Sequence, residues 1–196
     1  MKKCIKRYLN WLQPSSPSQD NAVNHTATKH YINNYGYIPL WVLVKVLSFG
    51  IVSELFSILK KEDQYDIVEL YDLDVNVFTN YLSSLSNYRN LCAHEDILYN
   101  NRTQKSILDT KYHRLLNIPI MDNEYIYGKN DLFSVVIMMK SMIKKDEFDL
   151  FEKEISDLID ELDNKLKSIE INKILDCMGF PKNWKELKDI DKKEIF

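Results

Sequence analysis

The sequence predicts an all-α fold. Apolar residues recur every three or four positions along several long segments, which is the spacing of one face of an α-helix. The 196-residue chain contains only four glycines and five prolines, so few residues interrupt these segments. Its hydrophobic fraction of 45% is that of a chain with a buried core, which excludes collagen-like and disordered proteins. The length suits one domain with a short appendage.

Residues 1–19 are predicted to be separate from the rest of the chain. Residues 1–13 have the pattern of a short basic amphipathic helix, and Pro14 and Pro17 among serines then break it. We therefore place a boundary near residue 19 and assign residues 20–196 to one helical domain. Residues 21–35 are predicted to form a polar helix that stops at Gly36, because glycine tolerates the left-handed backbone of a helix end.

The most apolar stretch of the chain runs from Ile38 to Leu59, and we expect the segment at residues 41–61 to form the centre of the core. Pro39 stands where prolines open helices. The run Ser48-Phe49-Gly50 divides the segment, which predicts two helices in succession. The charged residues Lys45 and Glu54 favour a buried helix over a membrane span.

The remaining elements follow from the same periodicity. Apolar side chains recur at helical spacing throughout residues 75–94, which predicts a long helix. Pro119 and Gly128 mark residues 100–130 as an irregular connection, whose tip is open between a loop and a small hairpin. Further helices are predicted at residues 64–71, 131–144, 146–168 and 171–178, followed by a short closing segment at residues 181–187.

Charge and cysteine content limit the class of protein. The net charge is −3, so the chain does not bind nucleic acid through bulk positive charge. The three cysteines form no C-x-x-C pair, which disfavours a disulfide framework and a structural zinc site. We expect a cytoplasmic protein without a signal peptide and without membrane contact. The charge is uneven, because residues 102–114 are basic and residues 146–163 are strongly acidic.

A short segment at the end of the long predicted helix combines residue types that carry chemistry. Residues 87–94 read Asn-Tyr-Arg-Asn-Leu-Cys-Ala-His. Only four of the 26 basic residues are arginines, so Arg89 stands out, since a planar guanidinium contacts a phosphate through several donors. His94 supplies an imidazole, which titrates at about pH 6.5 and so exchanges protons near neutral pH.

The pattern R-N-x-C-A-H resembles the catalytic signature of HEPN-superfamily ribonucleases, and its surroundings resemble the Abi (abortive infection) protein family. The wider resemblance spans roughly residues 29–187 and rests on the segments PLWVLVKVLSFGIVSELFSILKK, YLSSLSNYRNLCAHEDILYNN and MGFPKNW. It implies a HEPN-like helical bundle with short C-terminal helices and RNA cleavage without a metal or another cofactor. It also implies a homodimer that acts in phage defence or as a toxin, with an antitoxin protein or a small RNA as partner.

The resemblance and the residue types together point to catalytic roles for Arg89, Asn90 and His94. His94 would move a proton to or from RNA, Arg89 would stabilise charge on the phosphoryl oxygens, and Asn90 would orient His94 or the phosphate. Attack by the 2′-hydroxyl would restrict the substrate to RNA and leave a 2′,3′-cyclic phosphate. Four basic residues are candidate contacts to the RNA backbone: Arg102, Lys105, Lys111 and Arg114. Two polar residues are supporting candidates: Glu95 and Asn100.

Helix geometry limits how these residues can meet. In a regular helix Arg89 lies within about 60° of Leu85, on the apolar face, so we expect a buried guanidinium with a carboxylate, phosphate or carbonyl partner. Arg89 and His94 are about 140° apart, so one helix does not easily aim both at one phosphate. Either the helix ends or distorts after Cys92, or two copies pair across a two-fold axis. The resemblance favours the second arrangement.

Two other functions stay open. A non-catalytic helical module that binds RNA or a protein would keep the motif only for dimer packing. A regulatory protein that neutralises or anchors another enzyme would be recognised by a co-purifying partner. A metal site built from Cys92, His94, Glu95 and His113 lacks zinc-like spacing. Each catalytic candidate, taken singly, also fits a structural role.

Overall fold

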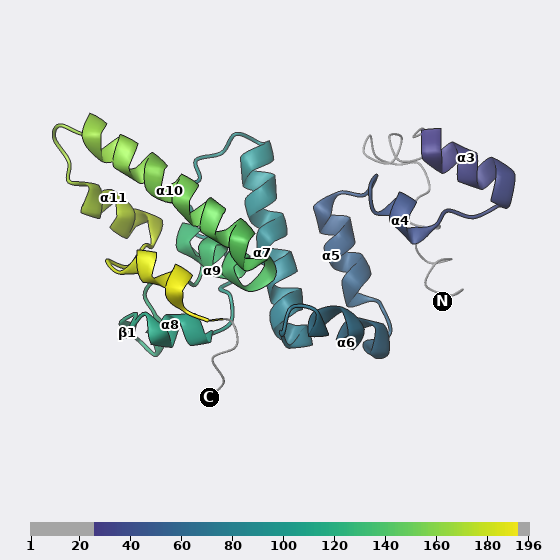
Figure 1. Ribbon diagram of the computed structural model, residues 1–196, viewed down its shortest axis with the longest axis horizontal. Coiled ribbons are helices and arrows are strands. Elements are labelled where there is room, and N and C mark those ends of the chain that lie inside the picture. The colour runs from purple at the N-terminus through teal and green to yellow at the C-terminus, as the bar shows by residue number, and fades with distance from the viewer. Residues whose placement is uncertain (1–25, 192–196) are drawn as a thin grey trace. The chain divides into compact units, whose positions relative to one another are not determined.

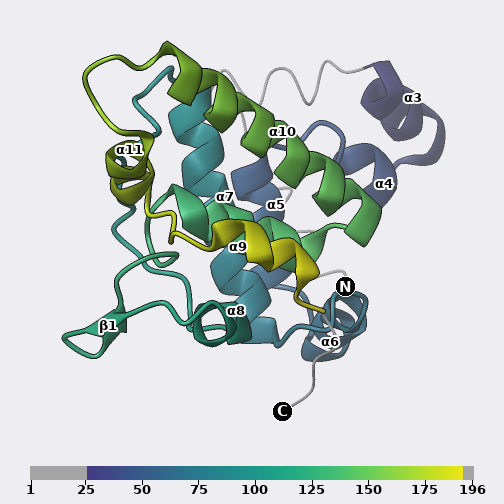
Figure 2. The same ribbon diagram turned by 60° about the vertical axis from the view of Figure 1, so that its left-hand side comes forward.

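The computed structural model describes residues 26–191 (Figures 1 and 2). The basic helix and linker predicted at residues 1–19 lie outside this part, so they and the boundary near residue 19 stay predictions. Contacts divide the chain into two compact units, Met1–Asp66 and Ile67–Phe196. Between residues 26 and 191 every regular element except one short hairpin is helical, which confirms the all-α class. No helix in these residues combines the length and apolar character needed to cross a bilayer.

The described part of the first unit consists of short helices: α3 (Thr26–Tyr35), α4 (Leu40–Leu43), α5 (Phe49–Ser57) and the start of α6 (Lys61–Glu69). α3 stops as predicted at Gly36, whose φ of +70° is left-handed. The Gly36 N–H donates to the carbonyl of Ile32. Ser48 caps α5 by accepting a hydrogen bond from the Ile51 N–H. The predicted pair of successive helices is therefore confirmed.

The prediction that residues 41–61 form the centre of the core is wrong. Trp41 is 67% exposed, and only Val42 and Phe56 among the apolar residues of this segment are buried. The main cluster of buried side chains lies within the second unit. Hydropathy shows which side chains are apolar, but it does not show whether another part of the protein packs over them and buries them.

The second unit is built around α7 (Val75–Ala93), α9 (Leu132–Met142) and α10 (Lys145–Lys165). α9 contacts both α7 and α10, and Figure 2 shows it lying between them. Phe133, Ile137 and Met138 of α9 are fully buried, which makes this helix the centre of the core. Two shorter elements, α11 (Ile171–Met178) and the 3₁₀ helix η1 (Trp184–Asp189), pack against α10.

The predicted irregular connection between α7 and α9 contains α8 (Lys111–Leu115) and a small hairpin. Strands β1 (Ile120–Met121) and β2 (Glu124–Tyr125) pair antiparallel. The two residues between them, Asp122 and Asn123, have φ of +52° and +66°. Asp and Asn tolerate this left-handed region, so they suit a tight turn. The choice that the sequence left open is thus settled as a hairpin.

Candidate functional site

The three predicted catalytic residues lie together at the C-terminal end of α7. Arg89 and Asn90 precede the helix end, and His94 is the residue that caps it. All three are exposed. A guanidinium nitrogen of Arg89 donates to Oδ1 of Asn90 at 3.3 Å, so the guanidinium and the amide are neighbours on the surface.

The expectation that Arg89 is buried is wrong. The buried residues of α7 are Phe78, Tyr81, Leu82, Ser84 and Tyr88. All of them except Ser84 lie within about 60° of Leu85, so the predicted face is the buried one along most of the helix. Tyr88 is the last buried residue of α7, and Arg89 directly after it is exposed.

Glu95 ends α7 in a conformation that is unusual for its residue type. Its φ is +57°, in the left-handed region where helix ends normally place glycine. The N–H of Glu95 donates to the carbonyl of Cys92, and the N–H of Asp96 donates to that of Leu91. This pair of bonds is a Schellman motif. α7 thus ends at Ala93, one residue beyond the end predicted after Cys92, and pairing of two copies stays a prediction. Cys92 itself is exposed.

We expect Glu95→Gly to raise the free energy of unfolding by about 0.5–1 kcal/mol, because glycine adopts a positive φ without a clash at Cβ. Equilibrium urea denaturation measures the change. The matched control is Glu154→Gly in the middle of α10, which should lower the free energy of unfolding by about 1 kcal/mol. Destabilisation by Glu95→Gly would mean that the Glu95 side chain makes an interaction stronger than the backbone strain.

Tyr88 fixes this end of α7 to the start of α9. Its buried hydroxyl donates to the carbonyl of Asp131 at 2.6 Å and lies 3.3 Å from Oγ of Ser134. The Asp131 carboxylate caps α9 by accepting the Ser134 N–H, and it also accepts the N–H of Gly128. Because Tyr88 directly precedes Arg89, these bonds set the rotation of α7 where the motif begins.

We expect Tyr88→Phe to lower the free energy of unfolding by about 1 kcal/mol, the usual net contribution of one buried hydrogen bond. Burial raises the pKa of the Tyr88 hydroxyl, so it stays protonated and available as a donor. Urea denaturation again gives the value, and Tyr65→Phe at an exposed tyrosine is the control without a predicted effect. Equal stability of the Tyr88 variant would show that the hydroxyl does not anchor α7.

Arg102 lies beside the same capping carboxylate. Its Nη1 is 3.6 Å from Oδ2 of Asp131, and the two side chains are 40% and 1% exposed. Burial raises the pKa of the Asp131 carboxyl to about 6, and the Arg102 guanidinium opposes this rise. Arg102 therefore has a structural partner, and its contact with RNA stays a prediction that relies on the exposed part of the guanidinium.

The basic segment that follows the motif is attached to α7 itself. The Asn80 side chain on α7 donates to the carbonyl of Ser106 at 3.2 Å. Its Oδ1 accepts the N–H of Leu108 at 3.1 Å. One amide side chain thus holds the segment on the helix that carries the predicted catalytic residues.

The remaining predicted contacts and supporting residues are spread along this connection. Lys105 and Arg114 are exposed, and so is Asn100 in the turn after the motif. Lys111 donates to the carbonyl of Asp191 at 3.1 Å, so it too has a partner within the protein. The second unit therefore contains all of these residues, and a hydrogen bond joins the side chains of Arg89 and Asn90.

His113 is a structural histidine. Its Nδ1 accepts the N–H of Thr110 at 3.1 Å, so the ring proton sits on Nε2, which donates to the carbonyl of Gly128 at 2.9 Å. Burial lowers the pKa of this imidazole, which keeps it neutral. His94 is exposed whereas His113 is fully buried. Within residues 26–191 no group of three or more His, Cys, Asp or Glu side chains is placed to hold a metal ion.

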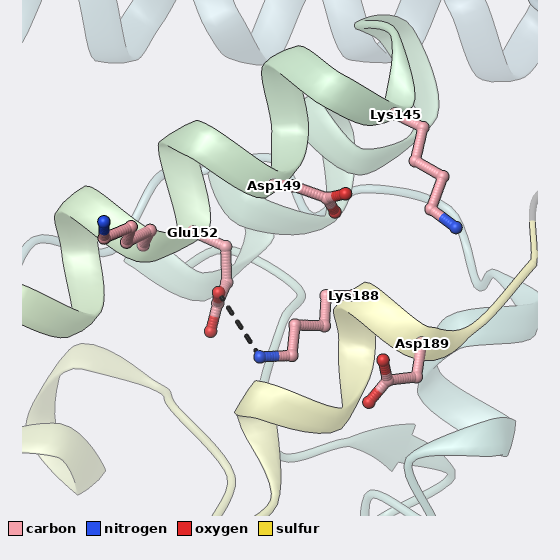
Figure 3. Close-up of a pocket in the computed structure, with 6 residues that line it drawn as sticks. Lys145, Asp149, Glu152, Lys188 and Asp189 are labelled. Atoms are coloured by element: carbon pink, nitrogen blue, oxygen red, sulfur yellow. Dashed lines mark ion pairs between the residues drawn. The ribbon is translucent and has the colours of Figure 1, made fainter.

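A pocket that the sequence does not predict lies between α10 and η1 (Figure 3). It has a volume of about 440 Å³ and six charged lining residues: Lys145, Asp149, Glu152, Lys153, Lys188 and Asp189. Glu152 is buried and lies 3.9 Å from Nζ of Lys188. The three positive and three negative side chains balance, so the pocket has no net charge to attract a phosphate. α10 and η1 form its two sides and are distant in sequence, so the periodicity of either helix does not predict that they meet.

Comparison with known proteins identifies a family. The family model described as Abi-like protein matches residues 2–100, about half of the chain, and this range ends just after the Arg89, Asn90 and His94 motif. No curated protein and no solved structure matches the chain. The chain therefore belongs to the Abi-like protein family, which supports a role in abortive infection.

Proposed function

We propose that this protein is a metal-independent endoribonuclease of the HEPN type that acts in phage defence or as the toxin of a toxin-antitoxin system. One observation carries the proposal: a guanidinium, an amide and an imidazole are all exposed at the end of one helix, in a protein of the Abi-like family. These groups suit phosphoryl transfer to an RNA 2′-hydroxyl, which needs a proton acceptor or donor and stabilisation of the charge on the phosphoryl oxygens.

The reaction follows from these groups. His94 takes the proton of the 2′-hydroxyl, whose oxygen forms a bond with the adjacent phosphorus, or it protonates the 5′-oxygen whose bond to phosphorus breaks. The products are a 2′,3′-cyclic phosphate and a free 5′-hydroxyl. Arg89 stabilises the charge that develops on the phosphoryl oxygens. Asn90, whose Oδ1 accepts a hydrogen bond from Arg89, orients the guanidinium.

The proposal needs two copies of the chain. α7 is helical through Ala93, and in a helix Arg89 and His94 point about 140° apart. A homodimer with a two-fold axis near this end of α7 would place groups from both chains around one phosphate. The basic segment held on α7 by Asn80 would then contact the RNA backbone beside the cleft. An antitoxin protein or a small RNA would keep such an enzyme inactive.

The test is the chemistry of cleavage in the presence of a chelator. Full-length protein is incubated with single-stranded and structured RNA in EDTA, and the product ends are identified. The proposal predicts a cyclic phosphate at the 3′ end and no cleavage of a substrate with 2′-deoxyribose at the scissile position. Cleavage that depends on a divalent metal, or cleavage of the deoxy substrate, would contradict it.

A further inference from the structure

The outward face of α10 presents leucines to solvent. This helix turns Phe148, Glu152 and Ile159 into the core. Three leucines on another part of its circumference are exposed by 60%, 65% and 37%: Leu150, Leu158 and Leu162. At about 100° per residue they fall within one sector of about 120°. The core of the second unit therefore does not need these side chains.

A row of carboxylates accompanies the leucines. Glu147, Glu154 and Glu161 are exposed and seven residues apart, so they lie in the same sector of α10. Glu147 also accepts the N–H of Lys144, and Glu161 pairs with Lys165 one turn later. Among residues 26–191 the side chain of Glu154 has neither a hydrogen bond nor an ion pair, so its charge is available to a partner.

The sign of the charge selects the kind of partner. Residues 146–163 contain nine acidic residues and one lysine, so α10 as a whole repels RNA and anionic membranes. A second copy of α10 would bring like charges together. The exposed leucines require apolar contacts in addition to ionic ones. The complementary surface is thus a helix with lysine or arginine beside a row of apolar side chains.

We propose that the face formed by Leu150, Glu154, Leu158, Glu161 and Leu162 is a docking surface for a basic amphipathic helix of a partner protein. The leucines pack between apolar side chains of that helix, as in a coiled-coil seam, and Glu154 and Glu161 pair with its flanking cations. This surface is independent of RNA cleavage, so it stands whether or not the proposed function is correct.

The test uses a fluorescein-labelled peptide of three heptads with leucine at positions a and d and lysine at e and g. Full-length protein is titrated into the peptide at about 0.15 M salt, and fluorescence anisotropy gives the affinity. We expect saturable one-to-one binding and none to the same peptide with glutamate in place of lysine. Combining Leu150→Gln with Leu158→Gln should weaken binding at least about tenfold. Combining Glu154→Lys with Glu161→Lys should reverse the preference to the glutamate peptide.

Two matched controls separate this surface from general stickiness. Leu70→Gln removes an exposed leucine outside α10, and Asp160→Lys reverses one charge on α10 outside the sector. Both should leave the affinity within about twofold of the original. The proposal would be overturned if the leucine substitutions left the affinity unchanged, or if the control substitutions lowered it as much. Either result would mean that the peptide binds a nonspecific acidic surface. A dimer of the peptide-free protein that Leu158→Gln dissociates would assign the face to a second copy and also overturn it.

Discussion

His94→Ala should lower the rate of RNA cleavage by about 10²- to 10⁴-fold, the usual contribution of a general acid or base. The side chain is exposed at the end of α7, so its removal opens no cavity. The free energy of unfolding should therefore change by less than about 0.5 kcal/mol. The measurements are initial cleavage rates in EDTA and urea denaturation of the same preparation.

His30→Ala is the control for the histidine, because His30 is also exposed but lies on α3 away from the motif in sequence. It should retain the full cleavage rate. If the His94 variant cleaves RNA as fast as the original, or if both histidine changes lower the rate equally, the assigned role of His94 is wrong.

Gly179→Ala should lower the free energy of unfolding by about 2–4 kcal/mol, the largest stability effect that we expect of a single substitution. Gly179 ends α11 with a φ of +80°, and a Cβ built there lies 2.1 Å from Cγ of Asp131. Asp131 cannot easily move aside, because its carboxylate accepts the N–H groups of Gly128 and Ser134. Chemical denaturation gives the change.

Gly36→Ala separates backbone strain from crowding. Gly36 has a similar φ of +70°, but no atom lies within 4 Å of a Cβ built there. Gly36→Ala should lower the free energy of unfolding by only about 1 kcal/mol, because the substitution adds left-handed backbone strain but no clash. If Gly179→Ala lowers the free energy of unfolding no more than Gly36→Ala does, Asp131 moves away from the added methyl group and the predicted clash is wrong.

The helices of this protein are largely predictable from its sequence. The long helix predicted at residues 75–94 is observed as Val75–Ala93, and the helix predicted at residues 171–178 has those bounds. Such agreement is expected, because helical periodicity and end signals such as Gly36 are local properties of the chain. The position of the motif at a helix end was predictable for the same reason.

Contacts between distant segments were not predictable. Asp131 joins α9 to Tyr88, Arg102 and Gly179, and no sequence spacing connects these residues. The exposure of Arg89 was missed because helical periodicity identifies the apolar face of α7 but does not show that burial on this face ends at Tyr88. The exposed Trp41 shows the converse error, since an apolar run predicts burial without showing what covers it.

The most direct test of the shared cleft mixes two inactive variants. Arg89→Ala and His94→Ala proteins are combined under conditions that exchange subunits, and cleavage is compared with that of each variant alone. If Arg89 of one chain works with His94 of the other, a dimer that contains one chain of each variant has one intact Arg89–His94 pair out of two. Half of the dimers in a random mixture are of this kind, so about a quarter of the original activity returns. A mixture as inactive as its components, with subunit exchange verified, would contradict a site composed from two chains.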